Sequence, residues 1–123
     1  APGETQAQAT AELQAIVDRL AEEDPTFKAT LKPTFERAPF VVAPDAAIVQ
    51  ILDRALENRL GETSAHSGQT FWTDAALFAD AGMETVLLGP IGFGLHSAEE
   101  WVDLASVVDL AYVLAEAAQM YCG

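Results

Sequence analysis

Hydrophobic and polar positions change their period within the first third of the chain. Residues 4–23 place apolar side chains at the spacing of one helix face, with acidic residues opposite. The apolar positions of that face are Leu13, Ile16, Val17 and Leu20. Residues 27–36 instead alternate apolar and polar, which predicts a strand with one solvated face, and Pro33 restricts it to an edge position.

A second group of elements follows the proline-punctuated run at residues 37–44. Apolar spacing predicts a helix that starts after Asp45 and ends at Gly61, and a third helix that Thr73 caps and Gly82 ends. A last helix is expected at about 103–121; it is apolar nearly all round, so we expect it to be largely buried. An extended piece at about 63–66 and an apolar strand at 85–88 complete the group, and the order strand, helix, strand predicts a parallel pair with a right-handed crossover.

Neither group contains enough elements to close a core. In the first group, one helix and one edge strand leave the hydrogen-bonding groups of the strand unpaired. In the second group, about two strands and a very apolar last helix resemble half of a larger sheet. We therefore predict an α/β fold of two incomplete domains, residues 1–38 and 39–123. The chain is interpreted as an excerpt whose partners come from elsewhere.

Composition narrows the class of protein. The 123 residues carry six Lys and Arg against 19 Asp and Glu, a formal charge of −13, which repels nucleic acid and anionic membrane surfaces. No apolar run approaches the roughly 20 residues that span a bilayer, and the first residues lack the features of a signal peptide. With its one cysteine, Cys122, the chain is predicted to be cytoplasmic, with no nucleic-acid or membrane partner.

The strongest candidate for chemistry is a glycine-rich loop that ends in a histidine. The run from Gly89 to His96 follows the apolar strand, and Ser97 with Glu100 has the spacing of a capping box for a following helix. An imidazole at such a helix entrance is suited to bind a metal ion, although a simple hydrogen-bonding role remains open. The sequence has no phosphate-binding loop, complete dinucleotide fingerprint or serine nucleophile elbow.

Two stretches, read together, resemble a known family. They are Phe71–Pro90, with its Thr-Asp-Ala helix start and its strand ending in Gly-Pro, and His96–Val102, with a His-x-x-x-Glu-aromatic-Val motif. In order and spacing these resemble the C-terminal part of the zinc-dependent aminoacylases, which include acetylornithine deacetylase, succinyl-diaminopimelate desuccinylase and glutamate carboxypeptidase. Residues 2–5 and the helix and strand after them resemble the second half of that family's small lid domain. Trp72 departs from the pattern, because the family often has glycine there.

The resemblance implies a fold and a chemistry. It implies half of an α+β lid, at 1–38, followed by the C-terminal part of a zinc-peptidase-like catalytic domain with a parallel-type sheet. Family members hold two zinc ions with histidine and acidic ligands, while a glutamate acts as general base. His96 matches the final histidine of that set, and the other ligands and the base would lie in a missing N-terminal part. The implied substrate is a small N-acyl amino acid or peptide, and the segment alone would be inactive.

Other residues keep two interpretations. Thr73 and Asp74 are adequate as a helix cap and a first-turn acid, or they contact substrate. Gly92 and Gly94 allow a tight turn, or in this family their loop approaches the substrate's carboxylate. Glu100 is assigned to the helix cap.

Two basic side chains lie outside these motifs. His66 lies before a polar loop with no acidic partner at ligand spacing and is interpreted as a surface histidine. Arg37 is a cation near the predicted hinge, and the sequence does not assign it a contact with the substrate's carboxylate.

A second hypothesis is a stand-alone, non-catalytic α/β binding or assembly module. The unpaired strand edge and the apolar last helix also predict that the chain associates with itself, as a homo-oligomer, or with another chain.

Overall fold

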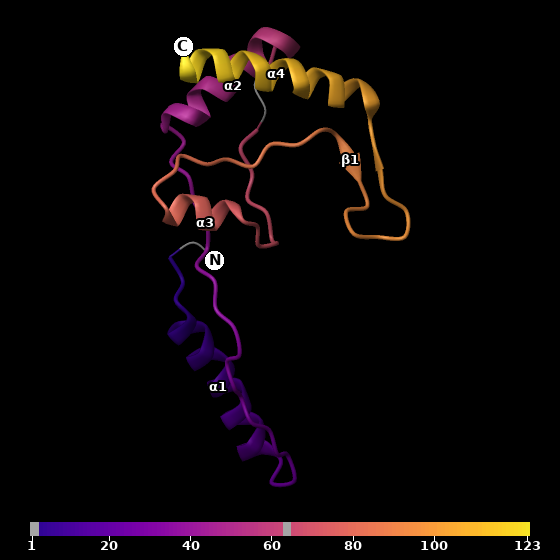
Figure 1. The fold of residues 1–123 in the computed structure, drawn as a ribbon. Coiled ribbons are helices and arrows are strands. Elements are labelled where there is room, and N and C mark those ends of the chain that lie inside the picture. Colours follow the sequence, from indigo (N-terminus) through magenta and orange to yellow (C-terminus); the bar gives the residue numbers. More distant parts are fainter. Residues whose placement is uncertain (1–2, 63–64) are drawn as a thin grey trace. The chain divides into compact units, whose positions relative to one another are not determined.

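Helices dominate the regular structure of the described residues, 3–62 and 65–123, in this computed structural model (Figure 1). The chain divides into two units, Ala1–Val41 and Val42–Gly123. The first holds helix α1, and the second holds the remaining helices and one short sheet. The bounds are α1 Gln6–Glu23, α2 Ala47–Leu60, α3 Ala75–Asp80, β1 Gly92–Phe93, β2 Trp101–Val102 and α4 Leu104–Cys122.

Helix α1 confirms the first predicted helix. Thr5 caps it in a capping box: its hydroxyl accepts from the backbone N–H of Gln8, and the Gln8 side chain accepts from the backbone N–H of Thr5. Asp24 is the C-cap of the helix. Its carboxylate accepts hydrogen bonds from the hydroxyl of Thr26, which has the larger effect, and from the backbone N–H of Thr26; both lower the pKa of Asp24. No residue of α1 is buried, so its apolar face lacks a cover within the first unit.

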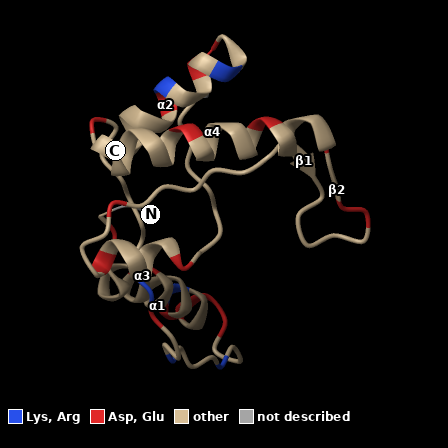
Figure 2. Cartoon of the chain, turned by 45° about the horizontal axis from the view of Figure 1, so that its top comes forward, with Lys and Arg blue, Asp and Glu red and all other residues tan. Residues whose placement is uncertain are grey.

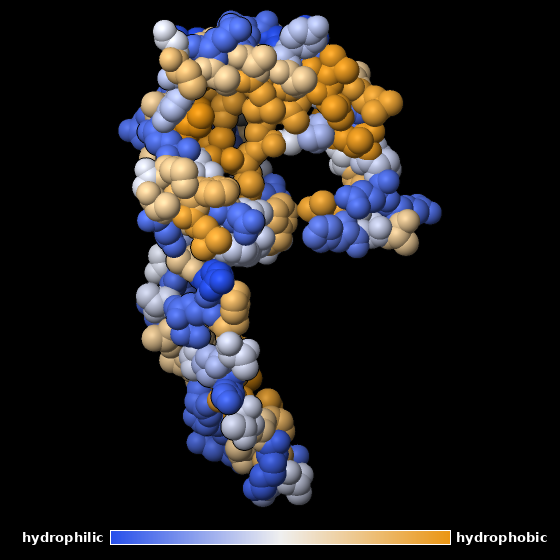
Figure 3. All heavy atoms as spheres, in the orientation of Figure 1, coloured by the Kyte–Doolittle hydropathy of each residue, from blue (hydrophilic) through white to orange (hydrophobic). Residues whose placement is uncertain are grey.

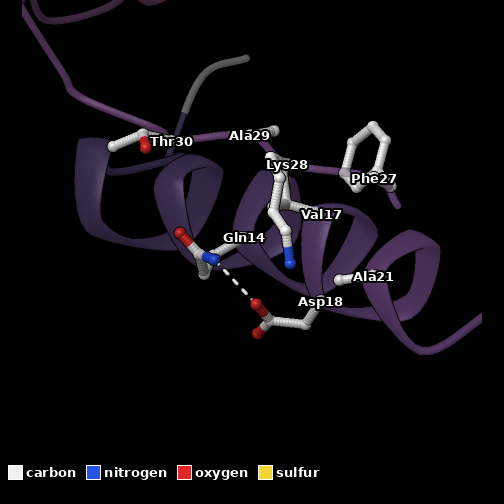
Figure 4. Close-up of a pocket in the computed structure, with 8 residues that line it drawn as sticks. All are labelled: Gln14, Val17, Asp18, Ala21, Phe27, Lys28, Ala29 and Thr30. Atoms are coloured by element: carbon white, nitrogen blue, oxygen red, sulfur yellow. Dashed lines mark hydrogen bonds between the residues drawn. The ribbon is translucent and has the colours of Figure 1, made fainter. Parts of the chain in front are cut away.

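The segment after α1 runs back along the helix, but residues 27–36 form no strand. Figure 4 shows the shallow crevice between α1 and the start of this segment. Its lining residues are Gln14, Val17, Asp18, Ala21, Phe27, Lys28, Ala29 and Thr30. A strand is defined by its ladder with a neighbour, and the described residues offer none here, so alternation alone does not produce the predicted strand.

In the second unit, α2 packs against α4 and supplies most of the core. Ala55 of α2 and Val113 of α4 are fully buried, with 0% exposure. Val86 and Leu88, from the segment predicted to be a strand, pack partly against this core. The cluster consists of Leu52, Ala55, Leu56, Val113 and Ala117.

Polar contacts join the same two helices. The Arg59 guanidinium donates to Asp109 Oδ1 at 2.7 Å and lies over the ring of Tyr112, 4.4 Å from its centroid. The Asn58 amide donates to Glu116 at 2.6 Å. Asn58 and Arg59 are exposed while Asp109 and Glu116 are half-buried, so water screens these contacts and each adds only modestly to stability.

Glycines end two of the helices as predicted. Gly61, the C-cap of α2, has φ of 79°, and Gly82, just after α3, has φ of 82°. Both lie in the left-handed region that glycine enters without steric cost. The start of α2 is completed by Glu84, whose carboxylate accepts from the backbone N–H of Ile48 at 3.2 Å.

The sheet differs from the expected one. Within the described residues it is a two-stranded antiparallel hairpin, in which Gly92 pairs with Val102 and Phe93 with Trp101. Residues 85–88 are not a strand, and no parallel pair is formed among the described residues. A parallel strand has to hydrogen-bond a neighbour reached by a crossover, and the described chain places none beside residues 85–88. Residues 63 and 64, half of the extended piece expected at 63–66, lie outside the described residues.

Helix α4 is apolar, as predicted, but the expectation that it is largely buried is wrong for this chain. Only Val113 and Ala117 are buried, whereas Leu104 is 76% exposed and Val108 53%. Figure 3 shows apolar residues covering the N-terminal half of α4 and the adjoining hairpin strands. Burial of this face needs a partner surface that the described residues of the second unit do not supply. Among the described residues, no helix combines the length and hydropathy needed to cross a membrane.

Candidate functional site

His96 lies in the loop that joins β1 to β2. Its φ is 62°, and it is the only described residue other than glycine with positive φ. That conformation costs a residue with a side chain about 1–2 kcal/mol, and such strain concentrates at functional positions. The ring is exposed and makes no hydrogen bond or ion pair within the described part of the chain. The imidazole nitrogens are therefore available to an external ligand.

The loop is shaped by close contacts at its two glycines. The backbone N–H of Ser97 donates to the carbonyl oxygen of Gly94 at 2.8 Å, and the Ser97 hydroxyl donates to the carbonyl oxygen of Glu99 at 2.8 Å. A Cβ on Gly94, whose φ is 77°, would collide with the Glu99 carbonyl and lie 2.7 Å from the Ser97 hydroxyl. A Cβ on Gly92 would lie 2.8 Å from the carbonyl oxygen of Trp101. Both glycines thus have a structural requirement of their own.

The predicted capping box at Ser97 and Glu100 is wrong. Helix α4 begins at Leu104, and its N-cap is Asp103, whose carboxylate accepts from the backbone N–H of Ser106 at 2.7 Å. The residues just before this cap form β2 and pair with β1, so the histidine stands in a hairpin loop rather than at a helix entrance. The loop carries two acidic residues, Glu99 and Glu100, and Figure 2 shows red ribbon in this hairpin.

The base of the hairpin is fixed to the start of α4. The backbone N–H of Ile91 donates to the Ser106 hydroxyl at 2.9 Å, and the backbone N–H of Asp103 donates to the Ile91 carbonyl at 2.8 Å. Phe93 and Trp101 stack across the two strands with their ring centroids 6.5 Å apart. These contacts join the strands that carry the His96 loop to the start of α4.

Thr73 and Asp74 lie at the start of α3, apart from the hairpin in sequence. Thr73 is half-buried and Asp74 is exposed, and neither side chain makes a hydrogen bond within the described residues. The N-cap is Asp74 with a helical backbone, so the prediction that the Thr73 side chain caps this helix is wrong. Thr73 contributes to the start of the helix through its backbone alone: its carbonyl oxygen accepts a hydrogen bond from the backbone N–H of Ala76 at 3.2 Å.

These candidates form one local group and one separate pair. Gly92, Gly94 and His96 share the hairpin, while Thr73 and Asp74 share the start of α3, and no hydrogen bond or ion pair links the two sets within the described residues. Residues 3–62 and 65–123 contain no group of three or more His, Cys, Asp or Glu side chains able to hold a metal ion.

Sequence reasoning missed a contact of His66. Its Nε2 lies 3.0 and 3.1 Å from the two carboxylate oxygens of Asp53 on α2, so His66 has an acidic partner. The two residues are thirteen positions apart, which is why no local spacing revealed the pair. The available signal was Asp53 itself, an acid between the apolar positions of α2. Arg37 belongs to the first unit, where its guanidinium lies over the Phe35 ring at 4.3 Å.

Comparison with known proteins places the chain in a class of hydrolases. The model of peptidase family M20/M25/M40 matches residues 2–120, nearly the whole chain. The chain therefore belongs to peptidase family M20/M25/M40, and the family resemblance drawn from its motifs is confirmed.

Individual relatives bear names of acyl-removing enzymes. A succinyl-diaminopimelate desuccinylase of a Nitratiruptor species is 31% identical over 87 residues, which are 71% of this chain and 24% of that protein. One of Nautilia profundicola is 33% identical over 93 residues, 76% of this chain and 25% of that protein. An acetylornithine deacetylase of Myxococcus xanthus is 27% identical across 99% of this chain and 31% of its own length. The chain thus spans about a quarter to a third of these relatives. No solved structure matches it.

Proposed function

We propose that this chain is the C-terminal part of a metal-dependent amidohydrolase that cleaves the amide bond of N-acyl amino acids or peptides. The observation that carries the proposal is the exposed imidazole of His96, without a hydrogen bond in the described chain and in a strained conformation, within a member of peptidase family M20/M25/M40. The relatives' names, desuccinylase and deacetylase, describe the removal of an acyl group.

The His96 side chain fits a metal ion. A neutral imidazole with an unoccupied nitrogen is among the commonest protein ligands of zinc. In the proposal His96 holds one of two divalent ions, zinc by the resemblance, and the other ligands and the general base belong to the part of the protein outside this chain. The bound ions would activate water and polarise the scissile carbonyl. This segment by itself is inactive in the proposal.

The remaining candidates bind substrate. Gly92 and Gly94 lie in the same hairpin as His96, and backbone groups of this loop would meet the carboxylate of an N-acyl amino acid. Thr73 and Asp74 offer a hydroxyl and a carboxylate with no hydrogen bond inside the described chain, and these would orient the substrate's polar groups. The role of each residue is to position substrate against the ion that His96 holds.

In the proposed architecture each unit is part of a larger domain, and segments outside this chain supply the rest of that domain. Residues 1–38 would be the second half of a lid and dimerisation domain, and residues 39–123 the C-terminal part of a catalytic domain with a parallel-type sheet. Two observations support this: residues 27–36 keep strand alternation without a ladder, and the apolar face of α4 is exposed. The partners would be the N-terminal part of the same protein and a second copy that pairs along the lid edge.

The test is hydrolysis by the full-length protein. We expect release of the acyl group from N-succinyl or N-acetyl amino acids, loss of that activity after chelation, and its recovery with added zinc. Full activity in metal-free protein, or no amidase activity with any N-acyl amino acid, would contradict the proposal. The alternative, a stand-alone binding or assembly module, predicts instead that this chain alone is a folded, metal-free monomer.

A further inference from the structure

Residues 65–72 lead directly into Thr73 and Asp74, yet few contacts hold them. Within the described part of the chain no backbone–backbone hydrogen bond involves these eight residues. Two residues of this described segment make polar or ring contacts: Trp72 has a contact of its own, and the His66 side chain pairs with Asp53. The contact of His66, together with that of Trp72, therefore fixes the position of the segment.

The geometry of that contact is well defined. An ionised carboxylate only accepts hydrogen bonds, so the Nε2–H of His66 donates to Asp53, and the nitrogen lies nearly equidistant from both oxygens, at 3.0 and 3.1 Å. The Asp53 side chain is 23% exposed and that of His66 51%. Since the carboxylate is mostly shielded from water, the contact is stronger than one between two fully solvated groups.

The α2 side of the contact is rigid. Asp53 lies one turn after Val49 and one turn before Leu56, both of which are buried. Asp53 therefore lies beside the packed face of α2, on a helix that the core holds in place. Its hydrogen-bond donor, His66, comes from outside that helix. A segment with few contacts of its own is attached to a fixed point.

We propose that His66 is a positioning residue: its contact with Asp53 anchors residues 65–72 to α2 and so places Thr73 and Asp74 for substrate. This inference rests on the proposed function, in which Thr73 and Asp74 contact the substrate. An unanchored segment has to be ordered when substrate binds, and that entropy is subtracted from the binding free energy. The anchor therefore acts on substrate binding, while the reacting groups remain unchanged.

Kinetics of the full-length protein test the anchor. His66→Ala is expected to raise KM about fivefold with kcat within twofold, the size of effect that one net hydrogen bond produces. Asp53→Ala should give the same increase, and the double variant no more than either single one, because all three remove one contact. His66→Gln keeps a side-chain N–H donor and should restore part of the loss.

Arg59→Ala is the matched control, because it removes an ion pair of α2 that joins α4 rather than the segment. It is expected to lower stability only slightly and to leave KM unchanged. Hydrogen exchange of amides 65–74 gives a second readout that needs no activity: His66→Ala should speed exchange there, and Arg59→Ala should not. Unchanged exchange in His66→Ala overturns the anchor, and faster exchange with unchanged KM overturns the positioning role. If the wild-type protein has no amidase activity, the proposed function fails while the exchange result still decides the anchor.

Discussion

Gly94 shows how a single residue sets the shape of the candidate site. Its positive φ and the adjacent Glu99 carbonyl leave no room for a side chain, and the same turn holds His96 in a left-handed conformation. The glycine-rich run was visible in the sequence, but its reason was not, because the clash involves a residue five positions away that only the hairpin brings close. Local sequence thus indicated where the site lies and left its geometry open.

Gly94→Ala is therefore expected to destabilise the hairpin. The added methyl group meets the Glu99 carbonyl in a conformation that alanine disfavours, so the free energy of unfolding should fall by about 2 kcal/mol. Urea unfolding of the full-length protein measures the change. Gly68→Ala is the control, because its Cβ would meet nothing within 4 Å and its φ is not in the left-handed region, so it should change stability by less than about 0.5 kcal/mol. Equal stability of the two variants would contradict this account of the loop.

At the scale of elements, helices were predictable and strands were not. The pattern that predicts α1 and α2 lies within each helix, and the stops at Gly61 and Gly82 depend on one residue's backbone. The strands expected at 27–36 and 85–88 need hydrogen-bonding neighbours, which no periodicity within a segment supplies. The hairpin was missed for a related reason: the capping-box pattern at 97–100 favoured a helix, whereas cross-strand pairing of Trp101 with Phe93 decided the outcome.

The packing of α2 on α4 makes its own prediction. Val113 is fully buried against α2, so Val113→Ala removes two methyl groups from the centre of the core and should lower the free energy of unfolding by about 2 kcal/mol. Glu57→Ala on the exposed side of α2 should change it by less than about 0.5 kcal/mol. Thermal and urea unfolding compare the two variants, and a Val113→Ala protein as stable as wild type would show that this helix pair is not the core.

At the scale of the whole molecule, the chain carries more apolar surface than its own described residues cover. The uncovered surface includes α1, which buries no residue, and the N-terminal half of α4 (Figure 3). A contiguous apolar patch such as the one on α4 marks an interface. Because the chain spans about a quarter to a third of its relatives, the proposed function assigns these surfaces to the rest of the same protein and to a second copy.

The most direct test of the central claim is the metal content of the dialysed full-length protein. The wild-type protein is expected to retain two divalent ions per chain, and His96→Ala about one, because the imidazole at position 96 is the ligand this segment contributes. His66→Ala is the matched control, since its histidine is bound to Asp53, and it should retain two. A His96→Ala protein that keeps both ions would contradict the assignment of His96 as a metal ligand.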